Sequence, residues 1–183
     1  VLNNGRFITG ANTVILSSPT ATVTRTNGWV HGNLRKNFGA AANKTFEVGT
    51  ANGYSPVAVN ATAGSFPTDV TATAVQAFAP GITPTSIAIE RFWDFTATGI
   101  TADLTFTYLD PVDFDHAPIT EANLLAYFGD AGFYTSVPGT VVVVGANTAQ
   151  VLGVTTFDKW TLAEPGILLG TDVSITKTDG SAT

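Results

Sequence analysis

The chain has 183 residues and a net charge of −6, with 44% hydrophobic but only 12% charged residues. Globular proteins usually carry about twice that charged share, and coiled coils and helical bundles need abundant Glu, Lys and Arg, so those architectures are excluded. The sequence has no cysteine, which excludes disulfides, thiolate chemistry and Cys-based zinc or iron–sulfur sites. Its 18 glycines, 9 prolines and many threonines are typical of a folded domain rich in β structure and turns.

The charge is unevenly distributed along the chain. Residues 1–91 carry six basic and three acidic side chains, whereas residues 92–183 carry two basic and eleven acidic ones. A dense basic patch with interleaved aromatic residues is missing, which argues against nucleic acid as a partner. A molecule with one positive and one negative half can instead stack end to end, so we expect copies of the chain itself, or neighbouring modules, as partners. The alternative is that the net charge only keeps the chain in solution.

Turn signals divide the chain into short segments. Asn-Gly and Pro-Gly pairs and single glycines recur every eight to twelve residues or so, the spacing of an all-β sandwich. The expected strands are residues 6–9, 13–16, 21–25, 28–34, 44–48, 56–61, 70–78, 91–96, 102–108, 141–144, 149–154 and 160–162. We therefore predict an all-β fold, an antiparallel β-sandwich of Ig-like or jelly-roll type.

Two of these segments show contrasting patterns. In residues 102–108, Leu104, Phe106 and Tyr108 alternate with polar residues, which predicts a strand with one buried face. Residues 13–16 are apolar on both faces after the first position, which predicts a strand covered on both sides. The tryptophans Trp29, Trp93 and Trp160 each lie among strand residues, and we expect them in the core.

Residues 120–128 are the one helix candidate. Thr120 can cap its start, and Leu124, Leu125 and Phe128 recur at helical spacing. A turn-like connection explains the same residues equally well. The fold prediction therefore includes at most one short helix.

A Glu-Pro-Gly sequence at residues 164–166 marks the expected domain boundary. We predict a β-sandwich domain over residues 1–165 and a linker plus strand over residues 166–183. The latter segment is too short for a core of its own, but Val173 and Ile175 alternate with polar residues as in a strand. This strand is expected to pair with a neighbouring subunit or to begin a further domain.

Several stretches resemble a β-rich repeat module of large bacterial cell-surface and secreted proteins, of the type common in Bacteroidota and often exported by type IX secretion. They are residues 9–16 (TGANTVIL), 28–36 (GWVHGNLRK), 44–49 (KTFEVG), 54–57 (YSPV), 91–94 (RFWD) and 157–162 (FDKWTL). Residues 172–179 (DVSITKTD) are similar to the first strand of an Ig-like surface repeat. The resemblance implies a structural or adhesive role and no catalytic activity.

One acidic loop is a candidate metal site. Asp110, Asp113 and Asp115 follow the strand at residues 102–108 and offer the hard oxygen ligands that calcium takes. Asp130 and Glu121 could complete the shell. A solvated acidic loop is the alternative, and no other cofactor is expected.

Catalytic motifs are missing from the sequence. His31 and His116 are far apart, and no Gly-x-Ser-x-Gly elbow or phosphate-binding glycine loop occurs. We therefore expect a protein that is not an enzyme.

The absence of both cysteine and methionine suits an oxidising exterior, so we expect an extracellular or cell-surface location. No apolar stretch reaches the ~18 residues that cross a bilayer, and no membrane span is predicted.

Together these features predict a structural protein, a module or protomer of a bacterial surface fibre, sheath or adhesin that assembles by head-to-tail and strand-donation contacts. The alternative is a carbohydrate-binding module of a secreted protein. In that case Tyr54, Tyr127, Phe133 and Tyr134 would stack against the sugar rings of surface glycans.

Overall fold

The computed structural model describes residues 1–130 and 133–167, and its regular structure is almost entirely β. The strands are β1 (Arg6–Leu16), β2 (Trp29–Phe38), β3 (Ala42–Phe46), β4 (Gly49–Thr50), β5 (Gly53–Tyr54), β6 (Val57–Gly64), β7 (Thr68–Val75), β8 (Ala88–Thr96), β9 (Ile100–Thr107), β10 (Leu125–Asp130), β11 (Phe133–Val137), β12 (Val141–Val143), β13 (Thr148–Val154) and β14 (Lys159–Ala163). Helical structure in these residues is limited to three short 3-10 turns, η1 (Thr85–Ile87), η2 (Glu121–Asn123) and η3 (Val144–Ala146). None of them has the length and hydrophobicity needed to span a bilayer.

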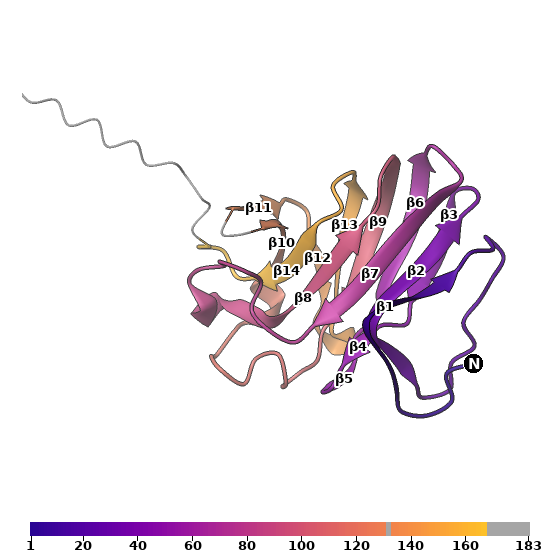
Figure 1. Cartoon of the computed structure of the whole chain (residues 1–183). Helices are drawn as coiled ribbons and strands as arrows, with labels where there is room; N and C mark the ends of the chain where they lie inside the picture. Colours follow the sequence, from indigo (N-terminus) through magenta and orange to yellow (C-terminus); the bar gives the residue numbers. More distant parts are fainter. Residues whose placement is uncertain (131–132, 168–183) are drawn as a thin grey trace, which may run out of the picture.

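The strands form two packed sheets (Figure 1). The larger sheet has seven strands in the order β1-β2-β7-β8-β14-β10-β11, and the smaller has five in the order β12-β13-β9-β6-β3. Strands β4 and β5 form a separate small hairpin. The predicted all-β sandwich is confirmed, with one departure from antiparallel pairing, because β1 runs parallel to β2.

Chain order is largely preserved across the sandwich. Strands β1, β2 and β3 lie at one end, and β10 to β13 lie at the other, as the colours of Figure 1 show. Across the two layers, β2 contacts β3 and β10 contacts β13. The two halves of the sequence therefore occupy opposite ends of the molecule. We call them the first end (β1–β3) and the second end (β10–β13).

The core between the sheets is built around aromatic rings. The centroid of the Phe106 ring lies 4.9 Å from that of Trp93 and 5.7 Å from that of Trp160. Both tryptophans are fully buried, as expected. The third, Trp29, is only half-buried, and its indole Nε1 donates a hydrogen bond of 3.0 Å to the backbone oxygen of Thr50.

A second apolar cluster lies on the outer face of the larger sheet. Phe92, Tyr127 and Tyr134 from β8, β10 and β11 are buried there. Residues 77–82, which follow β7, pack over them. Ile167 joins this cluster and is also buried, so the packed body continues past residue 165.

The predicted burial pattern was correct for residues 102–108, where one face of the strand is covered by the core. Leu104, Phe106 and Tyr108 are buried while the residues between them are half-exposed, so the predicted alternation is confirmed. The segment at residues 21–25 is not a strand, although Arg25 forms an isolated bridge with Leu2.

The expected burial of residues 13–16 on both sides was wrong, and of the two alternatives for residues 120–128 the helix is not formed. Residues 13–16 belong to β1, an edge strand. Ile15 is 48% exposed because it pairs with Arg35 on the outer face of the larger sheet, away from the smaller sheet. Residues 120–128 form the 3-10 turn η2 and then β10. Strand β10 has neighbours on both sides, with Ala126 buried in the main core and Tyr127 in the outer cluster. Apolar residues on both faces remove the period of two and imitate helical spacing.

Candidate functional site

A cleft opens in the larger sheet where β2 and β7 diverge. Their ladder ends at the pair Leu34 and Ala72. Beyond that point β2 turns toward Val48, which forms a bridge with Val30. The cleft has a volume of about 380 Å³.

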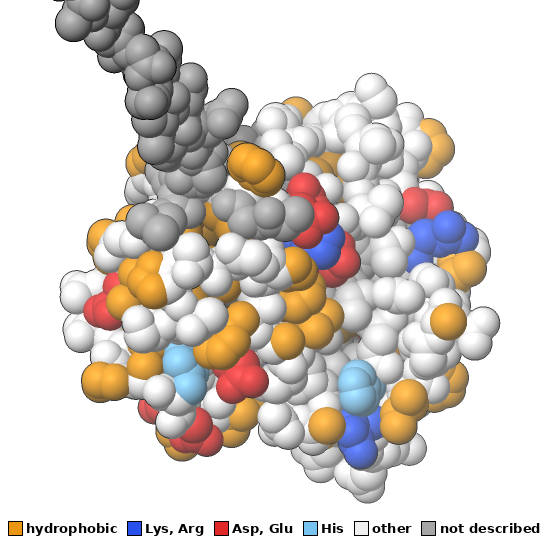
Figure 2. Space-filling model, turned by 60° about the vertical axis from the view of Figure 1, so that its left-hand side comes forward, with side chains coloured by type: hydrophobic (Ala, Val, Ile, Leu, Met, Phe, Trp, Pro, Cys, Tyr) orange, Lys and Arg blue, Asp and Glu red, His pale blue; other side chains and the backbone are white. Residues whose placement is uncertain are grey.

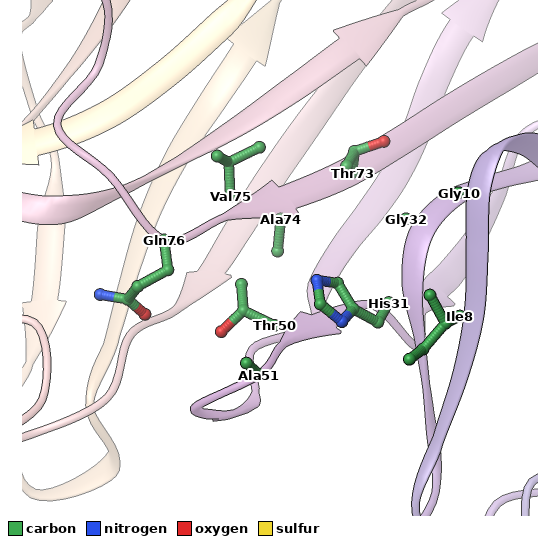
Figure 3. Close-up of a pocket in the computed structure, with 10 residues that line it drawn as sticks. All are labelled: Ile8, Gly10, His31, Gly32, Thr50, Ala51, Thr73, Ala74, Val75 and Gln76. Carbon is green, nitrogen blue, oxygen red and sulfur yellow. The ribbon is translucent and has the colours of Figure 1, made fainter.

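Neutral side chains from four strands line this cleft (Figure 3). They include Ile8 of β1, His31 of β2, Thr50 of β4, and Thr73 and Ala74 of β7, with Gln76 just after β7. Figure 3 shows the His31 ring between the end of β7 and the β4–β5 hairpin. No Asp, Glu, Lys or Arg lines the cleft.

Polar side chains of the cleft form hydrogen bonds with other groups of the protein. The Gln76 amide Nε2 donates to the Glu90 backbone oxygen at 2.6 Å, and the Thr73 hydroxyl donates to the Asn33 side chain. The Thr50 hydroxyl accepts from the Asn52 backbone N–H at 3.2 Å. Few lone pairs or N–H groups are left for a ligand, so this cleft is a weak candidate for catalysis or for tight binding of a polar molecule.

Next to the cleft lies a buried ion pair that joins a loop to the sandwich. Nε of Arg91 in β8 lies 2.7 Å from Oδ2 of Asp113, and neither side chain has any exposed surface. The same carboxylate accepts the Leu109 backbone N–H at 2.8 Å and the Gln76 Nε2–H at 3.0 Å. Asp113 therefore anchors the loop that follows β9.

This geometry bears on the predicted calcium site. Asp113 turns inward to Arg91, whereas Asp110 and Asp115 are exposed. Glu121 accepts a hydrogen bond of 2.7 Å from the Tyr108 hydroxyl, and Asp130 is ion-paired with Lys159 at 3.1 Å. Residues 1–130 and 133–167 contain no group of three or more His, Asp or Glu side chains placed to hold a metal ion. Calcium binding stays a prediction, and the structure gives Asp113 a structural role.

The four aromatic residues of the carbohydrate hypothesis do not share one exposed face. Tyr127 and Tyr134 are buried, and the Tyr134 hydroxyl donates to the Pro80 backbone oxygen at 3.1 Å. Burial raises the pKa of Tyr134 to about 12 and also raises the pKa of Tyr127. Tyr54 lies under the Arg25 guanidinium, 3.6 Å from its ring centroid. Only Phe133 is largely exposed.

The predicted strand donors, Val173 and Ile175, lie outside the described residues. Strand donation by that segment stays a prediction.

The surface has a feature that the sequence pattern did not indicate. The exposed large hydrophobic side chains of the described residues gather at the two ends of the sandwich, and none lies on the central strands. The set consists of Val1, Phe7, Ile8 and Ile15 at the first end and Phe133, Val141, Val143, Val144 and Leu152 at the second end. Apart from Val1, their exposed fractions range from 41% to 68%.

At the first end the exposed residues belong to β1. This strand is the edge of the larger sheet and is 11 residues long. Monomeric proteins usually protect such an edge with Lys, Pro or a short strand length. In β1 the only charged residue is Arg6, there is no Lys or Pro, and the protection is limited to an irregularity between Ile8 and Thr13.

Apart from Phe133 of β11, the exposed residues of the second end form an apolar strip on the smaller sheet. Val141 and Val143 belong to its edge strand β12 and pair with Gln150 and Thr148 of β13. Leu152 follows at the next position of β13 that points to the same outer face. We call these three residues, with the adjacent Val144, the β12–β13 strip.

The two ends carry opposite charge. Residues 1–46, which form β1, β2 and β3, contain five basic and no acidic residues, and two of them, Arg35 and Lys36, pair with Asp69 and Glu47. Residues 109–158, which include β10 to β13, contain six acidic residues and no Lys or Arg. Three of the six are ion-paired, because Asp113 is buried against Arg91, and Asp130 and Asp158 pair with Lys159 of the adjacent β14. Charged side chains are sparse on the face shown in Figure 2. The charge asymmetry of the sequence thus becomes an asymmetry between two apolar ends.

Comparison with protein-family models, with curated proteins and with solved structures found no match to the chain.

Proposed function

We propose that the chain is a non-enzymatic structural module of an extracellular fibre, sheath or adhesin on a bacterial surface, in which copies associate head to tail. The observation that carries this proposal is the pair of apolar, oppositely charged ends. Exposed apolar residues gathered in patches are typical of interaction surfaces. Complementary charge favours contact between unlike ends and opposes contact between like ends.

A head-to-tail contact has a structural consequence. When unlike surfaces meet and the rotation between copies does not close a ring, the assembly grows as an open filament. The low share of charged residues in the whole chain, 12%, lets filaments pack closely side by side. These properties suit a fibre or sheath.

The location outside the cell is supported by composition. A chain without Cys and Met cannot form wrong disulfides or suffer sulfur oxidation. The resemblance to surface modules points the same way. No geometric observation favours the carbohydrate alternative, because two of its four aromatic residues are buried.

The test is the association state of the purified chain from micromolar to millimolar concentration. We expect its mass in sedimentation and light scattering to grow with concentration, and negative-stain images to show filaments. High salt should weaken the association, because ions screen the attraction between exposed charges. A chain that stays monomeric over the whole range, in low and high salt, would contradict the proposal. Binding of that monomer to a glycan array would support the carbohydrate alternative instead.

A further inference from the structure

We infer that the junction between copies is formed by β1 of one copy and the β12–β13 strip of the next. This inference rests on the proposed function and identifies its contact surfaces. The partner is a second copy of this chain, because the first and second ends of one molecule face away from each other (Figure 1).

Three pairings of the two apolar surfaces can be compared. A contact of β1 with β1 brings together two ends whose strands, residues 1–46, carry five basic and no acidic residues. A contact of two β12–β13 strips brings together two ends whose acidic residues outnumber the basic ones, since Asp110, Asp115 and Glu121 are in no ion pair of the described residues whereas Asp113, Asp130 and Asp158 are paired. Only the unlike pairing combines apolar burial with charge attraction, and like charges across an interface are costly.

The shapes of the surfaces also suit this pairing. Ile8 and Ile15 pair with His31 and Arg35 of β2, so both point to the outer face of the larger sheet. Val141, Val143 and Leu152 form a raised apolar strip on the outer face of the smaller sheet. Each surface lies at the margin of its sheet, because β1 and β12 are edge strands.

Arg6 and Arg25 lie near the apolar residues of the first end. Arg6 begins β1, and Arg25 stacks on Tyr54 and donates through Nε to the Gly28 backbone oxygen at 2.8 Å. Neither arginine is ion-paired to a carboxylate within the described residues. Both are therefore available to carboxylates at the second end of the neighbouring copy.

The inference is tested with two variants that each block one surface. The first carries Ile8→Glu and Ile15→Glu, and the second carries Val141→Lys and Val143→Lys. All four side chains are exposed by 48% to 63%, so the fold should be retained and circular dichroism checks this. Each variant alone should be monomeric. An equimolar mixture should form a dimer with one copy of each, because every variant keeps one intact surface.

Matched controls place the same charges elsewhere. Ser65 is exposed on the turn between β6 and β7 and belongs neither to β1 nor to the β12–β13 strip. Ser65→Glu and Ser65→Lys should polymerise like the unaltered chain.

A second measurement uses the absence of native cysteine. A chain with Ile15→Cys and a chain with Val143→Cys, mixed and oxidised, should cross-link mainly to each other and several-fold less to themselves. This readout does not depend on the charge-reversing substitutions.

The outcomes separate this inference from the proposed function. If the unaltered chain polymerises but the two blocked variants form no mixed dimer, and the cysteine pair does not cross-link, this junction is wrong while the structural function stands. A dimer of the Val141→Lys and Val143→Lys variant alone would show that β1 contacts β1 and would also overturn it. If the unaltered chain never associates, the proposed function itself fails.

Discussion

Two buried ion pairs lie in different parts of the molecule and differ in their surroundings. Arg91 and Asp113 are 2.7 Å apart, with no exposed surface on either side chain. Lys36 and Glu47 at the first end are 2.6 Å apart, but 5% and 11% of their side-chain surfaces are exposed. A hollow of about 270 Å³ is lined by both Lys36 and Glu47, so this second pair borders the surface.

The two pairs have similar nitrogen–oxygen distances but different structural roles. The Arg91–Asp113 pair is hydrogen-bonded to two further positions of the chain, the Gln76 side chain after β7 and the Leu109 backbone after β9. The Lys36–Glu47 pair has fewer ties, although Lys36 also donates to the Thr45 backbone oxygen at 2.5 Å. An ion removed completely from water depends entirely on its partner, whereas one at the margin keeps some solvation. The predictions below follow this difference.

Removing Asp113 should have the largest effect. The substitution Asp113→Ala leaves the Arg91 guanidinium buried without its carboxylate, so we expect a loss of about 3–5 kcal/mol in the free energy of unfolding. Urea denaturation measures it. The control is Asp115→Ala in the same loop, where the side chain is exposed and the change should stay within about 0.5 kcal/mol. Equal losses in the two variants would contradict the role given to Asp113.

Replacing both members of the buried pair should be milder than removing one. The double substitution Arg91→Met with Asp113→Leu removes both charges and fills the space with apolar groups. Such replacements are often neutral or stabilising, so the double variant should be at least about 2 kcal/mol more stable than Asp113→Ala. The same denaturation experiment compares them. A double variant no more stable than the single one would show that the cost lies in loop contacts rather than in the unpaired charge.

Removing Glu47 should have a smaller effect. In this variant Lys36 keeps its hydrogen bond to the Thr45 backbone oxygen, and the adjoining hollow lets water approach the Lys36 ammonium group. We expect Glu47→Ala to lower the free energy of unfolding by about 1–3 kcal/mol. Arg35→Ala, which breaks an exposed pair with Asp69, should change it by no more than about 0.5 kcal/mol and serves as the control. A loss from Glu47→Ala as large as that from Asp113→Ala would remove the distinction between the pairs.

The smallest effect should be a pH dependence of the free energy of unfolding that comes from the Lys36–Glu47 pair. Burial lowers the pKa of Lys36 below its usual value of 10.5, although the bond to Glu47 opposes this. Between the lowered pKa and the usual value, the unfolded chain binds more protons than the folded one, so the Lys36 contribution to stability rises with pH.

Comparing the unaltered chain with Lys36→Met at neutral and alkaline pH isolates this contribution. The stability difference should shift in favour of the unaltered chain as pH rises. NMR titration of Lys36 should show the lowered pKa, and a further lowering in Glu47→Ala, because Glu47 raises it. A Lys36 pKa at or above its usual value would contradict the prediction.

The candidate surfaces could be predicted only in part. The opposite charges of the two halves are visible in the sequence, but their separation to opposite ends depends on chain order being kept across both sheets. The partner of Asp113 could not be foreseen, because Arg91 lies 22 positions away on another strand. The burial of Tyr127 and Tyr134 depends likewise on residues 77–82 folding over the larger sheet.

The wrong burial expected for residues 13–16 and the helix considered for residues 120–128 have one physical origin. Both are apolar on two faces, but Ile15 lies on an edge strand and is exposed, whereas Ala126 and Tyr127 lie on an inner strand and are buried. Side-chain alternation reports how many faces of a strand are apolar. It does not report which strands lie beside it.

The sequence by itself determined the β character of the chain, the strand at residues 102–108 with its buried face, and the charge asymmetry. These follow from covalent geometry and composition, because side chains of a strand alternate whatever its neighbours are. Only the tertiary structure decided which strands became edges, which apolar residues stayed exposed and which carboxylate met Arg91. Those outcomes depend on pairings between distant segments, and no local pattern encodes them.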